Sequence, residues 1–387
     1  MPLLRPKQTR GPPRPLSWKL PRDPLKPELP YRLGLSLAIR AHIPPPPFGF
    51  AYFKEAAPRP LANWTDLDGK TQSEWCLEHP PVDTPSHPDT TIRHLHMLEE
   101  LACRDGRGAQ VLRCSISDGN DDRVYVAKIY DPLYYAYVES IDDVTWKADR
   151  DYSCEAAAYE DLKKAAVDGS LAPKYYGSWT LNMDYPARPQ ATRPVRMILM
   201  EWIPDSVTMQ HLLDRGIPAR ISPQHRLDIL AKAMEVFSEM EFYGVKHEDF
   251  APRNVLLVGP EIESRMPGVM LFDFNMSAVF SRPTCKRRRE KSKLPISPQY
   301  LFWGECPIEF YDWVPKSHRS RRPMFLGWLK SRWEHATAFD GPSDSMKNYR
   351  DFNEPVEFAH PVEDKDAPPF SHEMPAKYHL QRISYPT

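Results

Sequence analysis

The 387-residue sequence predicts an α+β fold in which a small β-rich part precedes a larger, mainly helical part. Residues 111–116 and 123–130 are rich in β-branched and aromatic side chains, as strands are. Residues 151–166 and 224–243 instead repeat apolar side chains at helical spacing. Strands that precede helices in this order favour a small sheet-based lobe joined to a helical lobe.

The β-rich part is expected to contain two hairpins. Asp118-Gly119-Asn120 is a turn signal between the strands 111–116 and 123–130. Two further strands are expected at 175–181 and 196–202, with a proline-containing hairpin tip at 182–195 between them. Helix 151–166 lies between the hairpins and is favoured by three consecutive alanines.

The helical part has clear boundaries at its main helix. Ser222 and Pro223 are typical of a helix start, and Gly244 of a helix end. A polar loop follows, and then two short apolar runs at 255–258 and 269–272 predict strands. Beyond residue 280 the periodic pattern weakens.

The 43 prolines cluster toward both ends of the sequence. Proline lacks a backbone donor and disrupts helix and sheet interiors, so the ends are not expected to form regular core. We therefore expect a partly disordered proline-rich extension at residues 1–91, a folded domain at 92–335 and a proline-rich tail at 336–387. Within the extension, residues 31–39 and 48–53 are apolar enough to pack onto the domain.

Charge and cysteine content limit the partners. The net charge of −1 argues against a general nucleic-acid binder, and the six cysteines form no CxxC pair that would indicate zinc. No apolar run is long enough for a membrane helix, and no secretory signal is evident. We expect reduced thiols and a cytoplasmic location. The basic run at 286–293 resembles a nuclear localisation signal, which leaves the nucleus as an alternative, although such runs are usually solvated loops.

The most specific motif is His-Glu-Asp-Phe-Ala-Pro-Arg-Asn at residues 247–254. It places the carboxyl group of Asp249 five residues before the amide of Asn254, directly ahead of the apolar run at 255–258. This layout matches the loop H-x-D-x-x-x-x-N, in which the Asp accepts the proton of the nucleophile and the Asn holds a metal ion.

With these residues the chain resembles the protein kinase-like superfamily, which includes aminoglycoside and choline phosphotransferases, over residues 95–335. The resemblance implies a bilobal fold with an N-lobe at 92–202 and a mainly helical, reduced C-lobe at 203–335. It also implies ATP and Mg²⁺ as cofactors. A weak likeness of Cys306-Pro307-Ile308-Glu309 to the A-P-E motif is not taken as a match.

The resemblance gives roles to two charged residues of the N-lobe. Lys128 in Val-Ala-Lys-Ile resembles the lysine that contacts the α- and β-phosphates of ATP. Glu155 is the expected ion-pair partner of Lys128, with Glu160 as a rival on the same helix. An exposed strand lysine and an exposed helix glutamate are the plain alternatives.

Two further nucleotide-binding segments are implied. Gly106, Gly108 and Val111 resemble a shortened glycine-rich phosphate loop that lacks its third glycine, although D-G-R-G is also an ordinary turn. Glu201 and Trp202 follow a strand and resemble the hinge that binds the adenine edge through backbone groups.

The remaining roles fall in the C-terminal half. Asp249 is implied as the catalytic base, and Asn254 and Asp273 as ligands of Mg²⁺, the last within Leu-Phe-Asp-Phe-Asn. Arg253 is a hypothetical cation near the transferred phosphoryl group. His247 is expected to hold the loop in place rather than to take part in catalysis.

The chain departs from the family pattern at three positions. Glu248 replaces the arginine of H-R-D, which argues against control by activation-loop phosphorylation. Ala251 occupies the position of the usual Ser/Thr-kinase lysine. Asn275 replaces the glycine of D-F-G, and because asparagine tolerates a positive φ, a similar turn is expected there.

The sequence therefore predicts an ATP- and Mg²⁺-dependent kinase that transfers the γ-phosphoryl group to a hydroxyl group of a protein serine or threonine or of a small molecule. The alternative is a catalytically weak pseudokinase that binds nucleotide or acts as a scaffold, which the eroded glycine loop favours. A weaker alternative is a nuclear adaptor that acts through its proline-rich ends. The sequence names neither the acceptor nor the oligomeric state.

Overall fold

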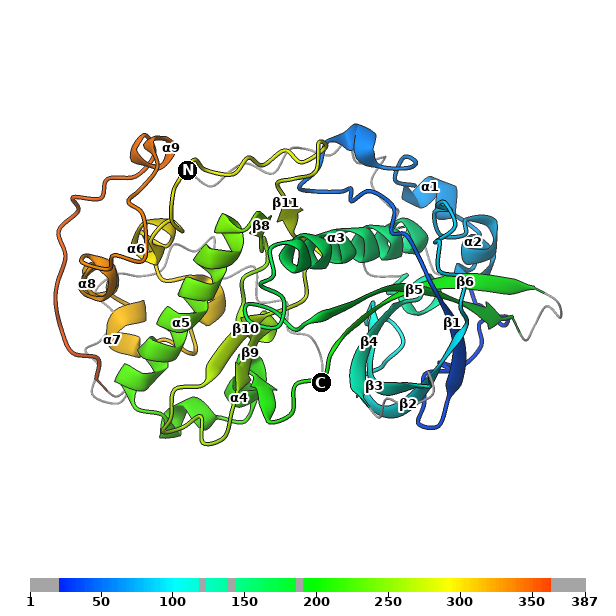
Figure 1. Cartoon of the computed structure of the whole chain (residues 1–387), viewed down its shortest axis with the longest axis horizontal. Helices are drawn as coiled ribbons and strands as arrows, with labels where there is room; N and C mark the ends of the chain where they lie inside the picture. Colours follow the sequence, from blue (N-terminus) through cyan, green and yellow to red (C-terminus); the bar gives the residue numbers. More distant parts are fainter. Residues whose placement is uncertain (1–20, 118–122, 138–142, 186–190, 363–387) are drawn as a thin grey trace. The chain divides into compact units, whose positions relative to one another are not determined.

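The computed structural model describes residues 21–117, 123–137, 143–185 and 191–362 (Figure 1). They form a mixed α/β fold with two compact units. Unit 1 takes the described residues up to Pro204, together with Tyr243–Asp249 and Phe272–Arg289. Unit 2 takes Asp205–Phe242, Phe250–Leu271 and the described residues from Glu290 onward. The two-lobed kinase arrangement stays a prediction.

Unit 1 is built on a closed antiparallel barrel of six strands in the order β1-β2-β3-β4-β6-β5. The strands are β1 (Ser36–Ala41), β2 (Arg93–Ala102), β3 (Gln110–Ser117), β4 (Val124–Tyr130), β5 (Tyr175–Asp184) and β6 (Thr192–Glu201). Alternation creates the barrel interior: in β3, for example, Leu112, Cys114 and Ile116 are buried. The expected β3–β4 and β5–β6 pairs are present.

The N-terminal segment supplies the strand that closes the barrel. β1 pairs with β2 on one side and with β5 on the other. It overlaps residues 31–39, the part of the extension that was expected to pack onto the domain but not to form a strand. It forms because Leu37 and Ile39 alternate with exposed neighbours and reach the interior. Six residues in a proline-rich context were too short a pattern to indicate a strand.

The second hairpin is longer than its sequence indicates. β5 continues to Asp184 and β6 begins at Thr192, so much of the expected tip is strand. Pro194 lies within β6, opposite Asn182. The predicted turn at 118–120, by contrast, lies outside the described residues.

Helix α3 (Val144–Lys164) packs against β4, β5, β6 and β11. It begins seven residues before the predicted start, because the side chain of Asp143 caps it by accepting a hydrogen bond from the backbone N–H of Trp146. The smaller elements of unit 1 are η1 (Lys54–Ala56), α1 (Trp64–Leu67), α2 (Gln72–Glu78), η2 (Pro132–Tyr134), β8 (Val245–Lys246) and β11 (Ala278–Val279).

Unit 2 is mainly helical around a small antiparallel sheet of order β10-β9-β7. Its helices and strands are β7 (Ser206–Thr208), α4 (Met209–Asp214), η3 (Ile217–Arg220), α5 (Pro223–Phe242), η4 (Pro252–Asn254), β9 (Val255–Val258), β10 (Gly268–Leu271), α6 (Pro298–Leu301), η5 (Ile308–Phe310), α7 (Lys316–Arg319), α8 (Arg322–Trp333) and α9 (Asp344–Lys347). The predicted helix and both predicted strands of this part are therefore present within a residue or two.

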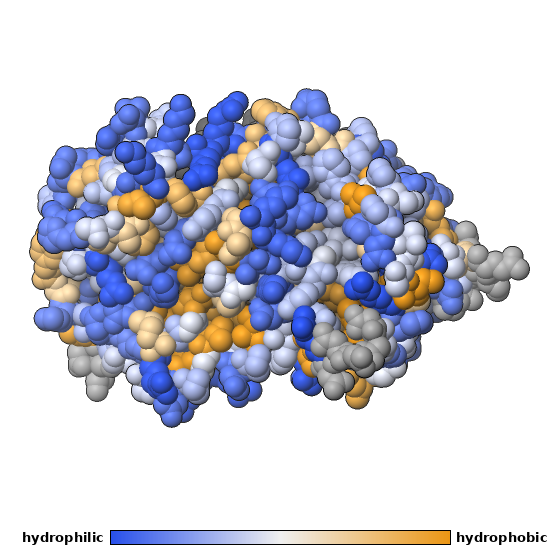
Figure 2. All heavy atoms as spheres, in the orientation of Figure 1, coloured by the Kyte–Doolittle hydropathy of each residue, from blue (hydrophilic) through white to orange (hydrophobic). Residues whose placement is uncertain are grey.

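The sheet of unit 2 has one buried face and one half-buried apolar face. Val255 and Leu257 of β9 are buried, whereas Leu256 of β9 and its partner Met270 of β10 are only partly covered. Figure 2 shows hydrophobic side chains gathered over the region of β9 and β10. No helix among the described residues combines the length and apolar character needed to cross a membrane.

Candidate active site

Lys128 is the centre of a buried cluster of charges in unit 1. It lies on β4, directly opposite Val111 of β3. Its Nζ atom donates to Oε2 of Glu155 at 2.5 Å and to Oδ1 of Asp273 at 2.6 Å. Because α3 carries Glu155 and the chain after β10 carries Asp273, the cluster joins three parts of unit 1. The predicted ion pair between Lys128 and Glu155 is present, and the rival Glu160 instead binds Arg282.

Tyr130 is a member of this cluster that sequence reasoning missed. Its hydroxyl group donates to Oε2 of Glu155 at 2.7 Å, and it is buried. Residues two apart in a strand point to the same face, so Lys128 already indicated the direction of the Tyr130 side chain. That spacing was the available signal.

The protonation states of the cluster follow from burial and charge. Burial alone lowers the pKa of Lys128, but the carboxylates of Asp273 and Glu155 outweigh it and raise the pKa above its usual value. Lys128 therefore stays an ammonium ion. Burial raises the pKa of Glu155 above its usual value, and Lys128 only partly opposes this effect.

Asp273 adopts an unusual backbone conformation, with a φ of 67°. The turn after β10 was expected to place a positive φ at Asn275, but the structure places it at Asp273, and Asn275 is outside the left-handed region. The side chain of Phe274 explains the difference. It is fully buried between the rings of Tyr159 on α3 and His247, at centroid distances of 5.0 and 5.2 Å, and this packing fixes the turn.

His247 connects the loop before Asp249 to the turn that carries Asp273. Its Nε2 atom lies 2.9 Å from the carbonyl oxygen of Phe272, and its Nδ1 atom accepts from the N–H of Asp249 at 3.3 Å. A carbonyl can only accept, so Nε2 carries the proton. Burial lowers the pKa of His247, which agrees with a neutral ring. The holding contact expected of His247 is thus present.

The other residues of the loop are divided between the units. Asp249 ends a segment of unit 1 and is partly exposed, whereas Arg253 and Asn254 belong to unit 2. There the backbone N–H of Asn254 donates to the carbonyl of Ala251 in the turn η4. Asn254 is buried and Arg253 is exposed. The structure therefore brings together Lys128, Glu155 and Asp273, while the metal-ligand role of Asn254 rests on sequence.

The glycine-containing loop lies between β2 and β3 and is tied down by its own contacts. Gly106 and Gly108 both have positive φ, and the N–H of Gly106 donates to the carbonyl of Tyr134 at 3.0 Å. The side-chain amide of Gln110 closes the loop by donating to the carbonyls of Arg104 and Gly108. A phosphate could use the Gly106 amide only by replacing the bond to Tyr134.

The segment expected to act as a hinge ends β6, and unit 1 extends to Pro204 just beyond it. The side chain of Glu201 accepts from the backbone N–H of Lys174 at 3.1 Å. The ring of Trp202 lies under the guanidinium of Arg113, 5.3 Å from its centroid. Both side chains are thus engaged within unit 1.

Glu248 forms an ion pair that inverts the family pattern. Its Oε1 atom accepts from Nε of Arg287 at 2.9 Å, and Arg287 belongs to the basic run at 286–293. Where the family pattern has an arginine that binds a phosphorylated residue, this chain has a carboxylate paired with an arginine. The pairing engages one residue of the basic run, and the absence of control by phosphorylation stays a prediction.

The oxygen donors present fit a hard cation. Mg²⁺ prefers oxygen ligands and keeps several ligands from water and phosphate, so it needs few protein side chains. Asp273 offers a carboxylate whose side chain is 31% exposed. Within the described ranges, no group of three or more His, Cys, Asp or Glu side chains forms a ready-made metal cage.

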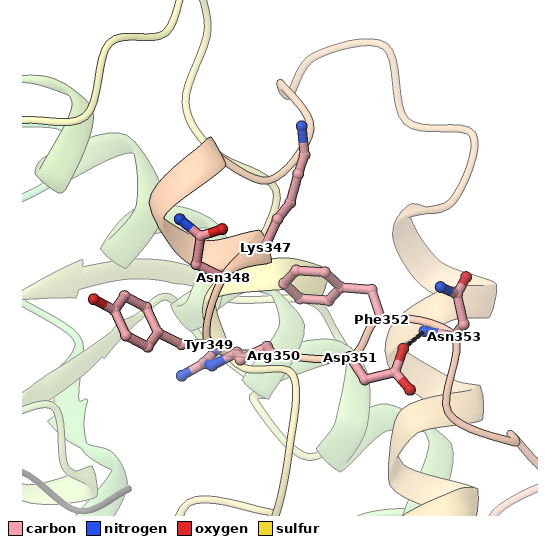
Figure 3. A pocket seen from close by; sticks show the side chains of 7 residues that line it. All are labelled: Lys347, Asn348, Tyr349, Arg350, Asp351, Phe352 and Asn353. Atoms are coloured by element: carbon pink, nitrogen blue, oxygen red, sulfur yellow. Dashed lines mark hydrogen bonds between the residues drawn. The ribbon is translucent and has the colours of Figure 1, made fainter.

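A surface pocket of about 450 Å³ lies elsewhere, in unit 2. Its lining is the consecutive stretch Lys347–Asn353 (Figure 3), and it includes none of the candidate site residues. Phe352 anchors the stretch by packing against the rings of Tyr300 and Trp303. The pocket is the inside of one chain turn, and its charged lining residues Lys347, Arg350 and Asp351 belong to that turn.

Solved structures similar to this chain include two that are named as kinase domains. WaaP in complex with acyl carrier protein is 18% identical and covers 47% of this chain and 63% of its own, with a TM-score of 0.30. The Mycobacterium tuberculosis PknI kinase domain is 15% identical (47% and 60%, TM-score 0.29), and the kinase domain of PF14_0431 is 14% identical (61% and 63%, TM-score 0.34). No family model and no curated protein matches the chain.

The chain spans about three fifths of the length of these structures. TM-scores this low carry no argument of their own, so the interpretation of the site rests on the residues described above.

Proposed function

We propose that this protein is an ATP- and Mg²⁺-dependent phosphotransferase of the protein kinase-like type, which transfers the γ-phosphoryl group to a hydroxyl acceptor. The observation that carries the proposal is the position of Lys128, fixed between Glu155 and Asp273 at 2.5 and 2.6 Å. A buried lysine held by two carboxylates, on the face of β4 that α3 covers, is unusual for a purely structural residue, because buried charges are costly.

The chain's own residues account for the steps that such a reaction needs. Lys128 would bind the α- and β-phosphates, and Glu155 would orient Lys128. Asp249 would accept the proton of the acceptor hydroxyl group, which is a role for a partly exposed carboxylate beside a fixed loop. Asp273 would be a ligand of bound Mg²⁺, which would neutralise phosphate charge, and the metal-ligand role of Asn254 stays a prediction from the sequence.

Three segments would complete nucleotide binding. The backbone at Glu201 and Trp202 would contact the adenine edge. The loop with Gly106, Gly108 and Val111 would approach the phosphates after the Gly106–Tyr134 bond opens. Exposed Arg253 would place positive charge near the transferred group.

A pseudokinase is the second candidate, and one specific observation favours it. The N–H of Gly106, which a phosphate loop would direct at the nucleotide, is bonded to Tyr134. In that case the charged cluster would bind nucleotide without efficient transfer.

A thermal-shift comparison followed by a turnover assay separates the candidates. For the kinase, we expect ATP with Mg²⁺ to raise Tm more than ATP with EDTA. A screen of protein and small-molecule hydroxyl acceptors should then show turnover that Asp249→Asn abolishes. Arg253→Ala should lower turnover and keep the nucleotide-dependent shift. A Mg²⁺-dependent shift without any turnover would identify the pseudokinase, and no shift at all would overturn both.

A further inference from the structure

Residues 48–53 of the N-terminal segment lie between α3 and the chain that follows Asp273. We propose that Tyr52 in this strap is a positioning residue that holds the two carboxylate-bearing elements of the candidate site together. The role in catalysis rests on the proposed function, whereas the mechanical coupling does not. In Figure 1 the N-terminal segment, coloured blue, runs alongside α3 toward β11.

The hydroxyl group of Tyr52 bridges two points of the chain after Asp273. It donates to the carbonyl of Ser277 at 3.1 Å and accepts from the backbone N–H of Val279 in β11 at 3.1 Å. Burial raises the pKa of Tyr52 above its usual value, so the hydroxyl group stays neutral and can donate and accept at once. Ser277 is only four residues beyond Asp273.

Backbone bonds on both sides of Tyr52 strengthen this contact. The N–H of Phe53 donates to the carbonyl of Thr284 at 2.8 Å, and the N–H of Lys286 donates to the carbonyl of Ala51 at 2.9 Å. Tyr52 and Cys285 therefore lie opposite each other as in an antiparallel bridge. The strap thus holds the chain from Ser277 to Lys286 along most of its length.

The same strap is packed onto α3. The ring of Phe48 meets Trp146 edge-on at 5.0 Å, and the thiol of Cys154 lies 3.2 Å from the carbonyl of Phe48. Gly49 makes the approach possible, because a Cβ there would lie 2.7 Å from Cδ of Arg150 at a φ of 104°. Cys154 immediately precedes Glu155, so the strap contacts α3 directly beside the glutamate that pairs with Lys128.

One small apolar cluster contains residues of the strap, of α3 and of the chain after Asp273. Its buried members are Ala51 and Tyr52 from the strap, Cys154 from α3, and Ala278 and Cys285 from the chain after Asp273. Lys128 has one carboxylate partner on α3 and the other next to this chain. The strap contacts both α3 and the chain after Asp273. It therefore fixes the separation between Glu155 and Asp273, the two carboxylates that Lys128 binds.

The test is Tyr52→Phe, which removes only the bridging hydroxyl group. Tyr31→Phe is a matched control, because the buried hydroxyl group of Tyr31 donates to Asp131 at 2.7 Å, away from the strap. In the ligand-free protein, we expect Tyr52→Phe to accelerate amide hydrogen exchange about tenfold or more both at 277–280 and in α3 around Glu155. Tyr31→Phe should leave both regions unchanged. Acceleration confined to Val279, which simply loses its own acceptor, would overturn the coupling.

A second measurement addresses the site itself. Tyr52→Phe should raise several-fold the Mg²⁺ concentration that gives half of the ATP-dependent Tm shift, and Tyr31→Phe should not, even where the two variants lose similar stability. Equal changes in both variants, or none in either, would contradict the positioning role. If the wild-type protein shows no ATP-dependent shift, the proposed function fails, and the exchange experiment alone decides whether the strap couples the two elements.

Discussion

Two buried ion clusters lie three residues apart along β4 and its end, and they are built differently. Asp131 is fully buried and pairs with Arg193 of β6, whose side chain is 6% exposed. It also accepts from the hydroxyl of Tyr31 and from the N–H of Leu133. The Lys128 cluster keeps one member, Asp273, 31% exposed.

The difference agrees with a stabilising role for the Asp131 cluster and with the chemistry proposed for the Lys128 cluster. We call the Asp131 cluster closed because both oxygens of the fully buried Asp131 have partners, although Nε of Arg193 has none among the described residues. In the Lys128 cluster, Oε1 of Glu155 is buried and has no hydrogen-bond partner among the described residues, and Asp273 is held at a positive φ. The unsatisfied atom does not distinguish the clusters, but backbone strain persists where another requirement competes with stability.

The largest expected effect is on function. Asp273→Asn keeps the size of the side chain but removes the charge proposed to bind Mg²⁺. We expect turnover to fall by a factor on the order of 10³ or more, and the Mg²⁺-dependent part of the ATP-induced Tm shift to disappear. Unfolding free energy should fall by about 1 kcal/mol or less, because the group is partly exposed. If the ATP-induced Tm shift of Asp273→Asn still depended on Mg²⁺, Asp273 would not be a ligand of the metal.

The closed cluster should respond in the opposite way. Asp131→Ala leaves Arg193 buried without its counter-charge, and removing one partner of a buried pair typically costs about 3–5 kcal/mol. Urea denaturation should show this loss, and the fraction that remains folded should bind ATP with wild-type affinity. A loss below about 1 kcal/mol would mean that the cluster is not structural.

The pH dependence of stability distinguishes the clusters further. The folded-state pKa of Glu155 is raised to about 7, chiefly by burial, above its ordinary value of 4.5. The folded state thus binds the proton more tightly, and wild-type stability should fall as pH rises from about 4.5 to about 7. Glu155→Gln removes the titrating carboxyl group and with it this pH-dependent loss of stability. The stability of the variant relative to wild type should therefore rise across that window by on the order of 1–3 kcal/mol. If this relative stability fell with pH instead, the charge of Lys128 rather than burial would determine the pKa of Glu155.

The smallest expected effect concerns an ion pair outside both clusters. Arg287 and Glu248 have side chains that are 36% and 15% exposed, and pairs of this kind contribute about 0.2–1 kcal/mol. A double-mutant cycle with Glu248→Gln and Arg287→Gln should give a coupling energy in that range. Phosphatase treatment should leave the activity of the wild-type protein unchanged, and an activity that requires phosphorylation would contradict the charge-inverted pairing.

Sequence reasoning placed residues correctly where a contiguous motif indicates its own strand, helix or turn. Val126-Ala127-Lys128-Ile129 and the segment around Asp273 carry their own strand or turn context, so their positions on β4 and after β10 were predictable. Helical spacing likewise placed Glu155 on α3, and the ion pair followed. The catalytic roles of these residues stay predictions.

The remainder depends on contacts between distant residues, which leave no periodic trace. Tyr52 and Ser277 are 225 positions apart, and nothing near either residue in the sequence indicates the other. The pairing of Arg287 with Glu248, across 39 positions, was hidden in a basic run that resembles a solvated loop. Proline content also obscured β1, because a short alternation inside a proline-rich stretch is weak evidence for a strand.

The contact between Lys128 and Asp273 has a thermodynamic consequence for ligand binding. Without a ligand, the ammonium of Lys128 and the carboxylate of Asp273 bind each other. An incoming phosphate or cation therefore has to replace one partner of this pair. A phosphate that draws Lys128 away leaves the carboxylate in need of a positive partner, and a cation at Asp273 likewise releases the ammonium. Nucleotide and metal should therefore bind with positive cooperativity, and by linkage each must strengthen the other by the same factor.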